Sequence, residues 1–167
     1  MDFDALYAEY FDRIHAYLCC RVGEDAQDVA AQVFRKALAK AEQYDSARGN
    51  VSQWLFGIAR NEANYHLRIS LLRRMIPLDL LHDSIPSREK PVCDTLADEQ
   101  EKKELLAALE TLSSRERDIV TLKFYSMLNN REIAEISGLS ESNVGTILHR
   151  AMGRLRQALT GGGHETA

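Results

Sequence analysis

The sequence predicts an all-α protein built from two small helical domains that a proline-containing linker joins. Apolar residues recur at three- and four-residue steps in both halves, and β-branched residues are scattered without strand-like alternation. All three prolines fall between residues 77 and 91, where they disfavour helix. We therefore predict a first domain over residues 1–75, a linker over 76–95, a second domain over 96–160 and a disordered tail over 161–167.

Three helices are expected in the first domain. The first begins near Phe3, carries an apolar face and is broken near Gly23. The second starts at Asp25 and ends around Tyr44. After a short polar loop, a third helix runs from about 51 to 73.

The second domain begins with a helix over about 96–111. Ser113 and Glu116 then have the spacing of a capping box, in which each residue caps a backbone amide near the start of the next helix. This element leads into the most informative segment of the chain.

Residues 129–159 have the pattern of a helix-turn-helix. Asn129 and Glu132 form a second capping box, Gly138 supplies the positive φ of a tight turn, and Ser140 caps the last helix. The buried stripe of that last helix is expected at Val144, Leu148, Ala151 and Leu155. Its outward face is polar and basic, with no carboxylate between residues 142 and 163. Such a helix suits a DNA major groove, although a simple packing hairpin would have a similar pattern.

The third helix and the loop before it form a second candidate site. Arg60, Asn61, Asn64 and Arg68 share an arc of about 100° on this helix, and such side chains bind phosphates and base edges. The preceding loop contains Gly49 and is flanked by Tyr44 and Trp54. Aromatic rings beside a basic loop can stack an unpaired base. Trp54 can equally be a core residue, and the two roles are compatible.

Charge and composition exclude several classes of protein. The net charge is −4, with an acidic stretch over 1–30 and a basic stretch over 58–76, which suggests a basic protein partner and a phosphate-bearing one. Three cysteines make no disulfide framework. His15 and Cys19 are one helical turn apart but lack further metal ligands, so no metal site is expected. Cys19 and Cys20 are treated as packing residues, because nothing nearby would lower a thiol pKa.

We expect a cytoplasmic, non-enzymatic protein. The sequence has neither a signal peptide nor an apolar run of about 20 residues. It also has no phosphate loop and no nucleophile with a positioned base, so neither a cofactor nor a catalytic residue is predicted.

Two segments together resemble the extracytoplasmic-function (ECF) family of RNA polymerase sigma factors. The first contains Asp25-Ala26-Gln27-Asp28-Val29, Phe34, Tyr44-Asp45, Gly49 and the run WLFGIARN over 54–61. The second runs from the Leu112-Ser113 start through Glu132-Ile133-Ala134 and Gly138-Leu139-Ser140 to Leu155-Arg156. The resemblance spans about residues 5 to 158. It implies a transcription initiation factor that binds core RNA polymerase, recognises −10 and −35 promoter elements and starts melting.

The resemblance also implies three sets of contact residues. The polymerase would be bound by Asp25, Asp28, Val29, Gln32 and Phe34. The −10 element would be held by Tyr44, Asp45, Ser46, Arg48, Gly49, Asn50, Trp54, Arg60, Asn61, Asn64 and Arg68. The −35 element would be read by Ser142, Asn143, Thr146, His149, Arg150 and Arg154. An anti-sigma protein is the expected inhibitor, and it could hold the protein at the inner membrane.

Four positions depart from the family pattern. Val33 stands where an acidic residue is frequent, Gly145 replaces a basic residue, and Tyr65 and Ile69 replace an acidic and a basic one. The departures at Val33 and Gly145 motivate one alternative, a sigma mimic that only titrates an anti-sigma protein. A second alternative is a helix-turn-helix regulator that acts without polymerase.

Overall fold

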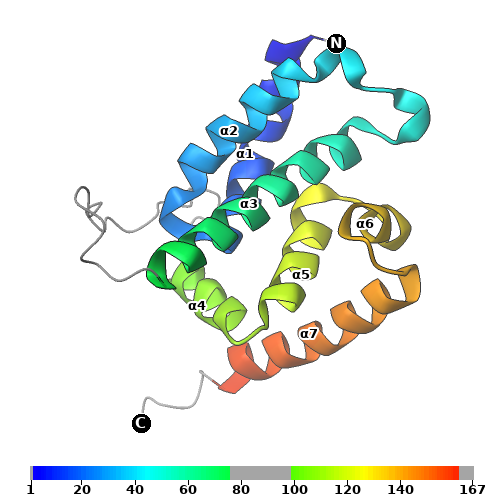
Figure 1. Ribbon diagram of the computed structural model, residues 1–167. Helices are drawn as coiled ribbons and strands as arrows, with labels where there is room; N and C mark the ends of the chain where they lie inside the picture. Colours follow the sequence, from blue (N-terminus) through cyan, green and yellow to red (C-terminus); the bar gives the residue numbers. More distant parts are fainter. Residues whose placement is uncertain (1, 76–98, 162–167) are drawn as a thin grey trace.

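The computed structural model describes residues 2–75 and 99–161, which contain seven α-helices (Figure 1). The helices are α1 (Phe3–Val22), α2 (Ala26–Ala39), α3 (Val51–Met75), α4 (Glu99–Glu110), α5 (Ser114–Ser126), α6 (Asn130–Ser137) and α7 (Glu141–Gly161). Three short 3-10 turns lie at Gly23–Asp25, Ala41–Gln43 and Ser46–Arg48. The all-α prediction is confirmed. The predicted linker, Cys93 and all of the tail except Gly161 lie outside the described residues.

The helix ends follow from local chemistry. The Asp2 carboxylate accepts the Asp4 and Ala5 amides at the start of α1, and Gly23, with a φ of 64°, ends that helix as predicted. One predicted end was wrong. We expected the second helix to reach Tyr44, but α2 ends at Ala39, and the 3-10 turn follows. The residues after Ala39 are mostly polar and exposed, so no core contact extends the helix.

The capping predictions in the second half are confirmed. Ser113 with Glu116 and Asn129 with Glu132 both form reciprocal capping boxes. Gly138 adopts a φ of 71° at the turn, and the Ser140 hydroxyl accepts the Asn143 amide at 3.2 Å. The predicted stripe on α7 faces inward, because Val144, Ala151 and Leu155 are buried and Leu148 packs against the core.

The described residues form two units that share one hydrophobic core. We call residues 2–75 the N-terminal unit and residues 99–161 the C-terminal unit. The main cluster joins Leu55 and Phe56 of α3 to Ile119 and Leu122 of α5 and to Ile133 of α6. Helices α1 and α3 therefore lie directly against α5 and α6 (Figure 1). The sequence predicts both units, but its local patterns do not predict that they pack against each other.

A smaller cluster extends the contact between the units. Cys20 of α1 packs among residues that otherwise all belong to the C-terminal unit, including Leu109, Leu112 and Val120. Both Cys19 and Cys20 are buried. The prediction that they are packing residues agrees with this burial, and Cys20 packs against the other unit.

Candidate nucleic-acid interface

The loop between α2 and α3 borders a pocket of about 410 Å³. The pocket is lined by Lys40, Gln43, Tyr44, Asp45, Arg48, Gly49, Gln53, Trp54, Gly57, Ile58, Asn61 and Ile136. Six of these residues belong to the predicted −10 set. The structure therefore brings the aromatic residues, the glycine loop and Asn61 together in one concave site.

The aromatic wall of the pocket is fixed by contacts within the loop. The rings of Tyr44 and Trp54 lie 5.2 Å apart at 48°, and the Tyr44 hydroxyl donates to the Gly49 carbonyl at 3.1 Å. Gly49 has a φ of 152°, and a Cβ there would lie 2.6 Å from Oε1 of Gln53. Only glycine fits this position without displacing Gln53. Trp54 both packs against the core and lines the pocket, so the two expected roles coexist.

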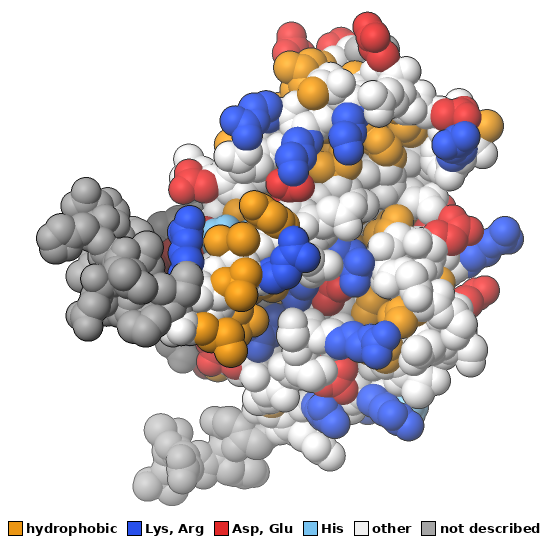
Figure 2. All heavy atoms as spheres, viewed as in Figure 1, with side chains coloured by type: hydrophobic (Ala, Val, Ile, Leu, Met, Phe, Trp, Pro, Cys, Tyr) orange, Lys and Arg blue, Asp and Glu red, His pale blue; other side chains and the backbone are white. Residues whose placement is uncertain are grey.

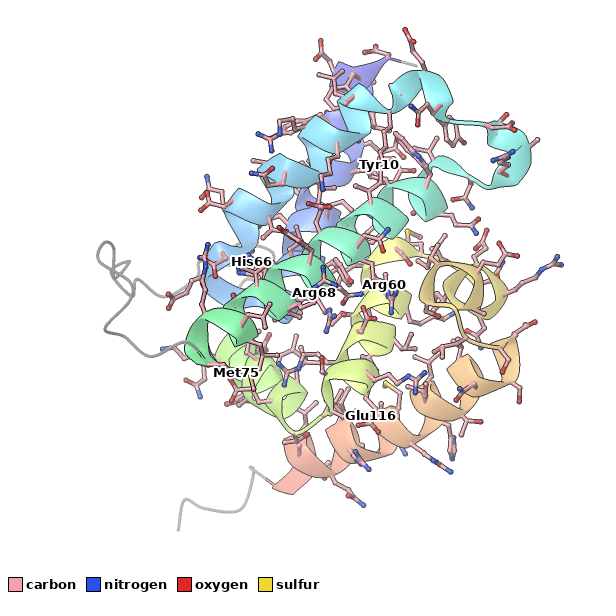
Figure 3. All side chains as sticks on the ribbon, viewed as in Figure 1. Tyr10, Arg60, His66, Arg68, Met75 and Glu116 are labelled. Atoms are coloured by element: carbon pink, nitrogen blue, oxygen red, sulfur yellow. The ribbon has the colours of Figure 1, made fainter. Side chains whose placement is uncertain are left out.

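The other predicted −10 residues do not line this pocket. Figure 3 shows Arg60 projecting from α3 toward the C-terminal unit, where its Nη1 donates to the Ile136 carbonyl at 3.3 Å. The Asn64 Oδ1 accepts from Arg21 at 2.8 Å. Ser46 and Arg68 are exposed elsewhere, and Asn50 donates to Glu132. The single binding face that we predicted on the third helix is therefore divided between a pocket side and an interunit side.

Sequence reasoning missed half of the pocket lining. Lys40 directly follows α2, and Gln43 ends the 3-10 turn after it, in a segment predicted as regular helix. Gln53 and Gly57 lie on α3 beside predicted residues, and the turn-by-turn spacing of the helix could have indicated them. Ile136 comes from α6, and no local pattern reveals a contact that depends on how the two units pack.

The outward face of α7 is accessible. All six predicted −35 residues, from Ser142 to Arg154, are exposed. Figure 2 shows Lys and Arg side chains gathered over this helix at the lower edge of the molecule. Arg154 forms an ion pair with Glu116, since its Nη1 lies 2.7 Å from Oε2 of that residue. Hydrogen bonds from Ser113, with help from Arg154, lower the pKa of Glu116, so this carboxylate stays charged at neutral pH.

The predicted polymerase contacts divide into exposed and buried residues. Asp25, Asp28 and Gln32 are exposed, and the Asp25 carboxylate lies 2.9 Å from Nε2 of His66. Val29 and Phe34 are each only 4% exposed, because they fall on the inward face of α2. In this structure both side chains pack in the core and hold the helix in place.

The Val33 departure has a simple structural reason. Val33 is fully buried in the core between α1, α2 and α3. An acidic residue at this position would face that core. The departure at Val33 therefore removes a charge from the core and not from the exposed side of α2.

The remaining site predictions concern metals and membranes. The Cys19 Sγ lies 3.8 Å from Nδ1 of His15, as their spacing suggests. Within residues 2–75 and 99–161, no group of three or more His, Cys, Asp or Glu side chains is arranged to hold a metal ion. None of the helices in those ranges combines the length and hydrophobicity that crossing a bilayer requires.

Comparisons with known proteins identify the family. The family model for sigma-70 region 2 matches residues 6–70, and the model for sigma-70 region 4 matches residues 102–155. The ECF RNA polymerase sigma factor RpoE of Cereibacter sphaeroides is 33% identical over 82% of this chain and 71% of its own length. BldN, an ECF sigma factor of Streptomyces coelicolor, is 28% identical over 94% of this chain, which spans 60% of that relative.

A solved structure has the same fold. The sigma factor RpoE of Bartonella quintana, in complex with the anti-sigma factor NepR, superposes with a TM-score of 0.77 at 23% identity, over 95% of this chain and 97% of the other. The match to region 2 removes the stand-alone helix-turn-helix regulator, because such a protein has no need of that region. The chain belongs to the ECF family of RNA polymerase sigma factors, non-enzymatic proteins that direct RNA polymerase to promoters.

Proposed function

We propose that this sigma factor uses two separate surfaces on promoter DNA. Residues 1–75 form the domain that binds polymerase and melts the −10 element, residues 76–95 form the linker, and residues 96–160 form the domain that reads the −35 element. The observation that carries the proposal is the pocket of about 410 Å³ between Tyr44, Trp54 and the Gly49 loop, within the segment that matches region 2.

The pocket suits one base that has been extruded from the non-template strand. Extrusion costs a few kcal/mol, and stacking on aromatic rings returns about 1–3 kcal/mol per base. Stacking on Tyr44 and Trp54 therefore offsets only part of the cost. Lys40 and Arg48 supply positive charge for the neighbouring phosphates, and the Asn61 amide can hydrogen-bond to a base edge. The same contacts hold the strand after it opens.

The face of α7 from Ser142 to Arg154 reads duplex DNA. The first turn of the helix presents Ser142 and Asn143, and Arg150 lies two turns further along the same exposed surface. A recognition helix inserts its first turns into the major groove, where Asn and Arg bond to base edges and phosphates. Arg154, held by Glu116, supplies a further positive charge for the DNA backbone.

The polymerase binds the exposed side of α2. Asp25, Asp28 and Gln32 present acceptors to solvent, while Val29 and Phe34 fix the helix from beneath. Carboxylates on a rigid helix suit a basic surface on the polymerase. These side chains lie outside the contact between the two units.

We further propose that an anti-sigma protein controls this factor in the cytoplasm. The Bartonella relative is bound by such an inhibitor, and one inhibitor could cover both the α2 surface and the DNA-facing surfaces. Where the inhibitor is anchored in the inner membrane, the sigma factor would be held there. Affinity purification from the native host, with and without stress, checks this control, and a free and constantly active protein would contradict it.

The deciding experiment combines core polymerase binding with transcription. Purified protein is added to core enzyme over a pool of genomic promoter fragments from its host. Transcripts that require both components support the proposed function and identify the promoters. Core binding without transcripts would instead identify a sigma mimic, and no core binding would overturn the assignment of α2.

A further inference from the structure

The glycine near the start of α7 lies at the edge of the predicted −35 face. Gly145 is one of the positions that depart from the family pattern, because it stands where a basic residue is common. It is partly exposed and lies one helical turn from Ser142 and from His149, two of the predicted −35 residues. The buried Val144 is its direct neighbour in the chain. The missing side chain therefore leaves a gap where the exposed face of α7 turns toward the core.

Asn130, the first residue of α6, lies in this gap. Helices α6 and α7 pack against each other (Figure 1). A Cβ built on Gly145 would lie 3.9 Å from the Nδ2 atom of Asn130, which is an ordinary van der Waals distance. A longer side chain that pointed the same way would compete with the Asn130 amide for this space. The glycine thus allows Asn130 to lie beside the −35 face.

The side-chain amide of Asn130 is available for a ligand. The capping of α6 is done by its neighbour, since Oδ1 of Asn129 accepts the Glu132 amide at 2.9 Å. Among residues 2–75 and 99–161, the Asn130 side chain has no hydrogen-bond partner, and the residue is partly exposed. Its amide can therefore donate to an acceptor outside the protein.

We propose that Asn130 is a further contact to the −35 element, and that its side-chain amide donates to a phosphate in place of the side chain that Gly145 lacks. This inference rests on the proposed function of α7. In a helix-turn-helix the first helix lies across the DNA backbone while the second enters the major groove. Asn130 begins that first helix and lies beside the second, so its amide meets the backbone next to the bases that α7 reads.

An amide contact differs from a basic contact in its dependence on salt. A neutral amide adds a hydrogen bond that fixes the register of α7 on the duplex. It releases no counterion, because it neutralises no phosphate charge. Gly145 is then not a lost DNA contact but half of a pair with Asn130. With Val33 in the core, neither departure supports the sigma-mimic alternative.

Substitution of Asn130 tests the contact directly. Fluorescence anisotropy measures binding of the polymerase complex to a −35 duplex, over a range of salt concentrations, for a promoter that wild type transcribes. Asn130→Ala should weaken binding about fivefold, the effect of one lost amide hydrogen bond, and should leave the salt dependence unchanged. Gln157→Ala removes an exposed amide further along α7 and is the matched control. Unchanged affinity in Asn130→Ala, or an equal loss in Gln157→Ala, would overturn the inference.

A basic residue at position 145 tests whether the two positions serve one contact. In the Asn130→Ala background, Gly145→Arg should restore binding about fivefold and increase the salt dependence by about one phosphate contact. In the wild-type background the gain should be at least threefold smaller, because the phosphate already has its donor. Equal gains in the two backgrounds would mean that the positions act independently and would contradict the pairing.

Arg150→Ala separates this inference from the proposed function of α7. If Arg150→Ala weakens binding to the −35 duplex and Asn130→Ala does not, only the inference about Asn130 fails. If neither substitution weakens binding, the assignment of α7 to the −35 element fails as well. Urea unfolding of each variant shows whether a loss of binding arises from a loss of folded protein, which would also count against a direct contact.

Discussion

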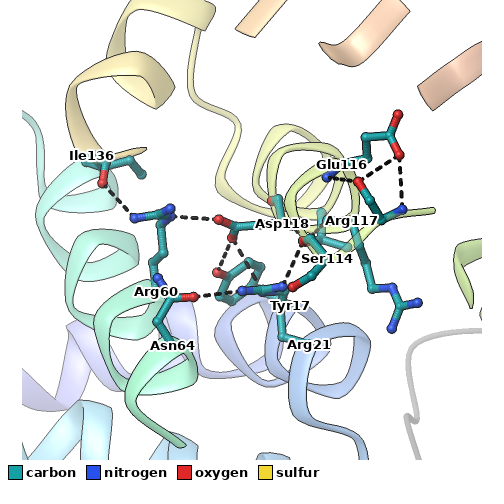
Figure 4. Close-up of polar contacts among 11 residues, drawn as sticks. Tyr17, Arg21, Arg60, Asn64, Ser114, Glu116, Arg117, Asp118 and Ile136 are labelled. Carbon is teal, nitrogen blue, oxygen red and sulfur yellow. Dashed lines mark hydrogen bonds and ion pairs between the residues drawn. The ribbon is translucent and has the colours of Figure 1, made fainter. Parts of the chain in front are cut away.

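Arg60 on α3 and Asp118 on α5 form a hydrogen-bonded ion pair across 2.8 Å, although 58 residues separate them in the sequence. Asp118 also accepts from Tyr17, whose pKa is raised by burial and by the nearby carboxylate, so the phenol remains a donor at all ordinary pH values. Because this pair joins the two units (Figure 4), the free energy of unfolding depends on the contact between them.

Removing Asp118 should be strongly destabilising. Asp118→Ala leaves Arg21 buried without its anionic neighbour, and breaking a buried ion pair on one side costs about 3–5 kcal/mol. Urea unfolding gives the change in free energy. Thr121→Val is the control, since it removes a buried hydroxyl that bonds only within α5, at a cost of about 1 kcal/mol. A loss below that of the control would mean that the cluster contributes little.

Met127 offers a stabilising substitution. It is 80% exposed and adopts a left-handed backbone conformation, with a φ of 58°, at the end of α5. Glycine takes this conformation without steric cost, so Met127→Gly should stabilise the protein by about 0.5–1 kcal/mol. Met152→Gly, the same change inside α7, should destabilise it by about 1 kcal/mol. Thermal unfolding of both variants checks the opposite signs.

The capping carboxylate of Glu116 predicts a pH dependence of stability. Its pKa in the folded protein is lowered from the ordinary value of 4.5, so its contribution is complete above pH 4.5 and is lost as the pH falls through the lowered pKa. Wild type should exceed Glu116→Gln in stability at pH 7, and the difference should vanish in acid. Urea unfolding from pH 7 to pH 3 measures it, with exposed Glu101→Gln as control. A difference that is constant with pH would exclude this origin.

Arg150 should act on duplex DNA alone. Arg150→Ala should weaken binding of the polymerase complex to the −35 element about tenfold and reduce the salt dependence by about one phosphate contact. Binding is measured by fluorescence anisotropy over a range of salt concentrations. Arg115→Ala removes an exposed arginine outside the −35 set and should have no such effect.

Asn64 should act mainly on strand opening. Asn64→Ala should leave −35 binding unchanged and reduce permanganate-detected melting about tenfold, the effect of one lost base-edge contact. The substitution also removes an acceptor of Arg21, so unfolding measurements must accompany it. If Arg150→Ala and Asn64→Ala both reduced only polymerase affinity, the assignment of the two DNA-facing surfaces would be wrong.

Features that depend only on residues close together in the chain could be predicted from the sequence. The capping boxes at Ser113 and Asn129, the Gly138 turn and the inward stripe of α7 all arise within a few residues of one another, and all are confirmed. The aromatic pocket was predictable in part, because Tyr44, Gly49 and Trp54 are close in sequence.

Contacts between distant segments were not predictable in this way. Arg60 and Asn64 have the composition of a DNA-binding face, yet their partners are Asp118 and Arg21. Donors that suit a phosphate also suit a carboxylate, so residue type alone cannot distinguish the two. The one available sign was Asp118 itself, a charge within the apolar face of α5.

The pairing of Arg60 with Asp118 also limits how this protein can evolve. If Arg60 both contacts promoter DNA and holds Asp118 between the two units, a substitution of Arg60 that suits a new promoter also leaves buried Asp118 without one of its two arginine neighbours. Descendants that change one position must compensate at the other, and we expect the two positions to covary among close homologues. New promoter preferences should therefore arise first on α7, because its predicted −35 residues are exposed and can be substituted with little effect on the packing of the chain.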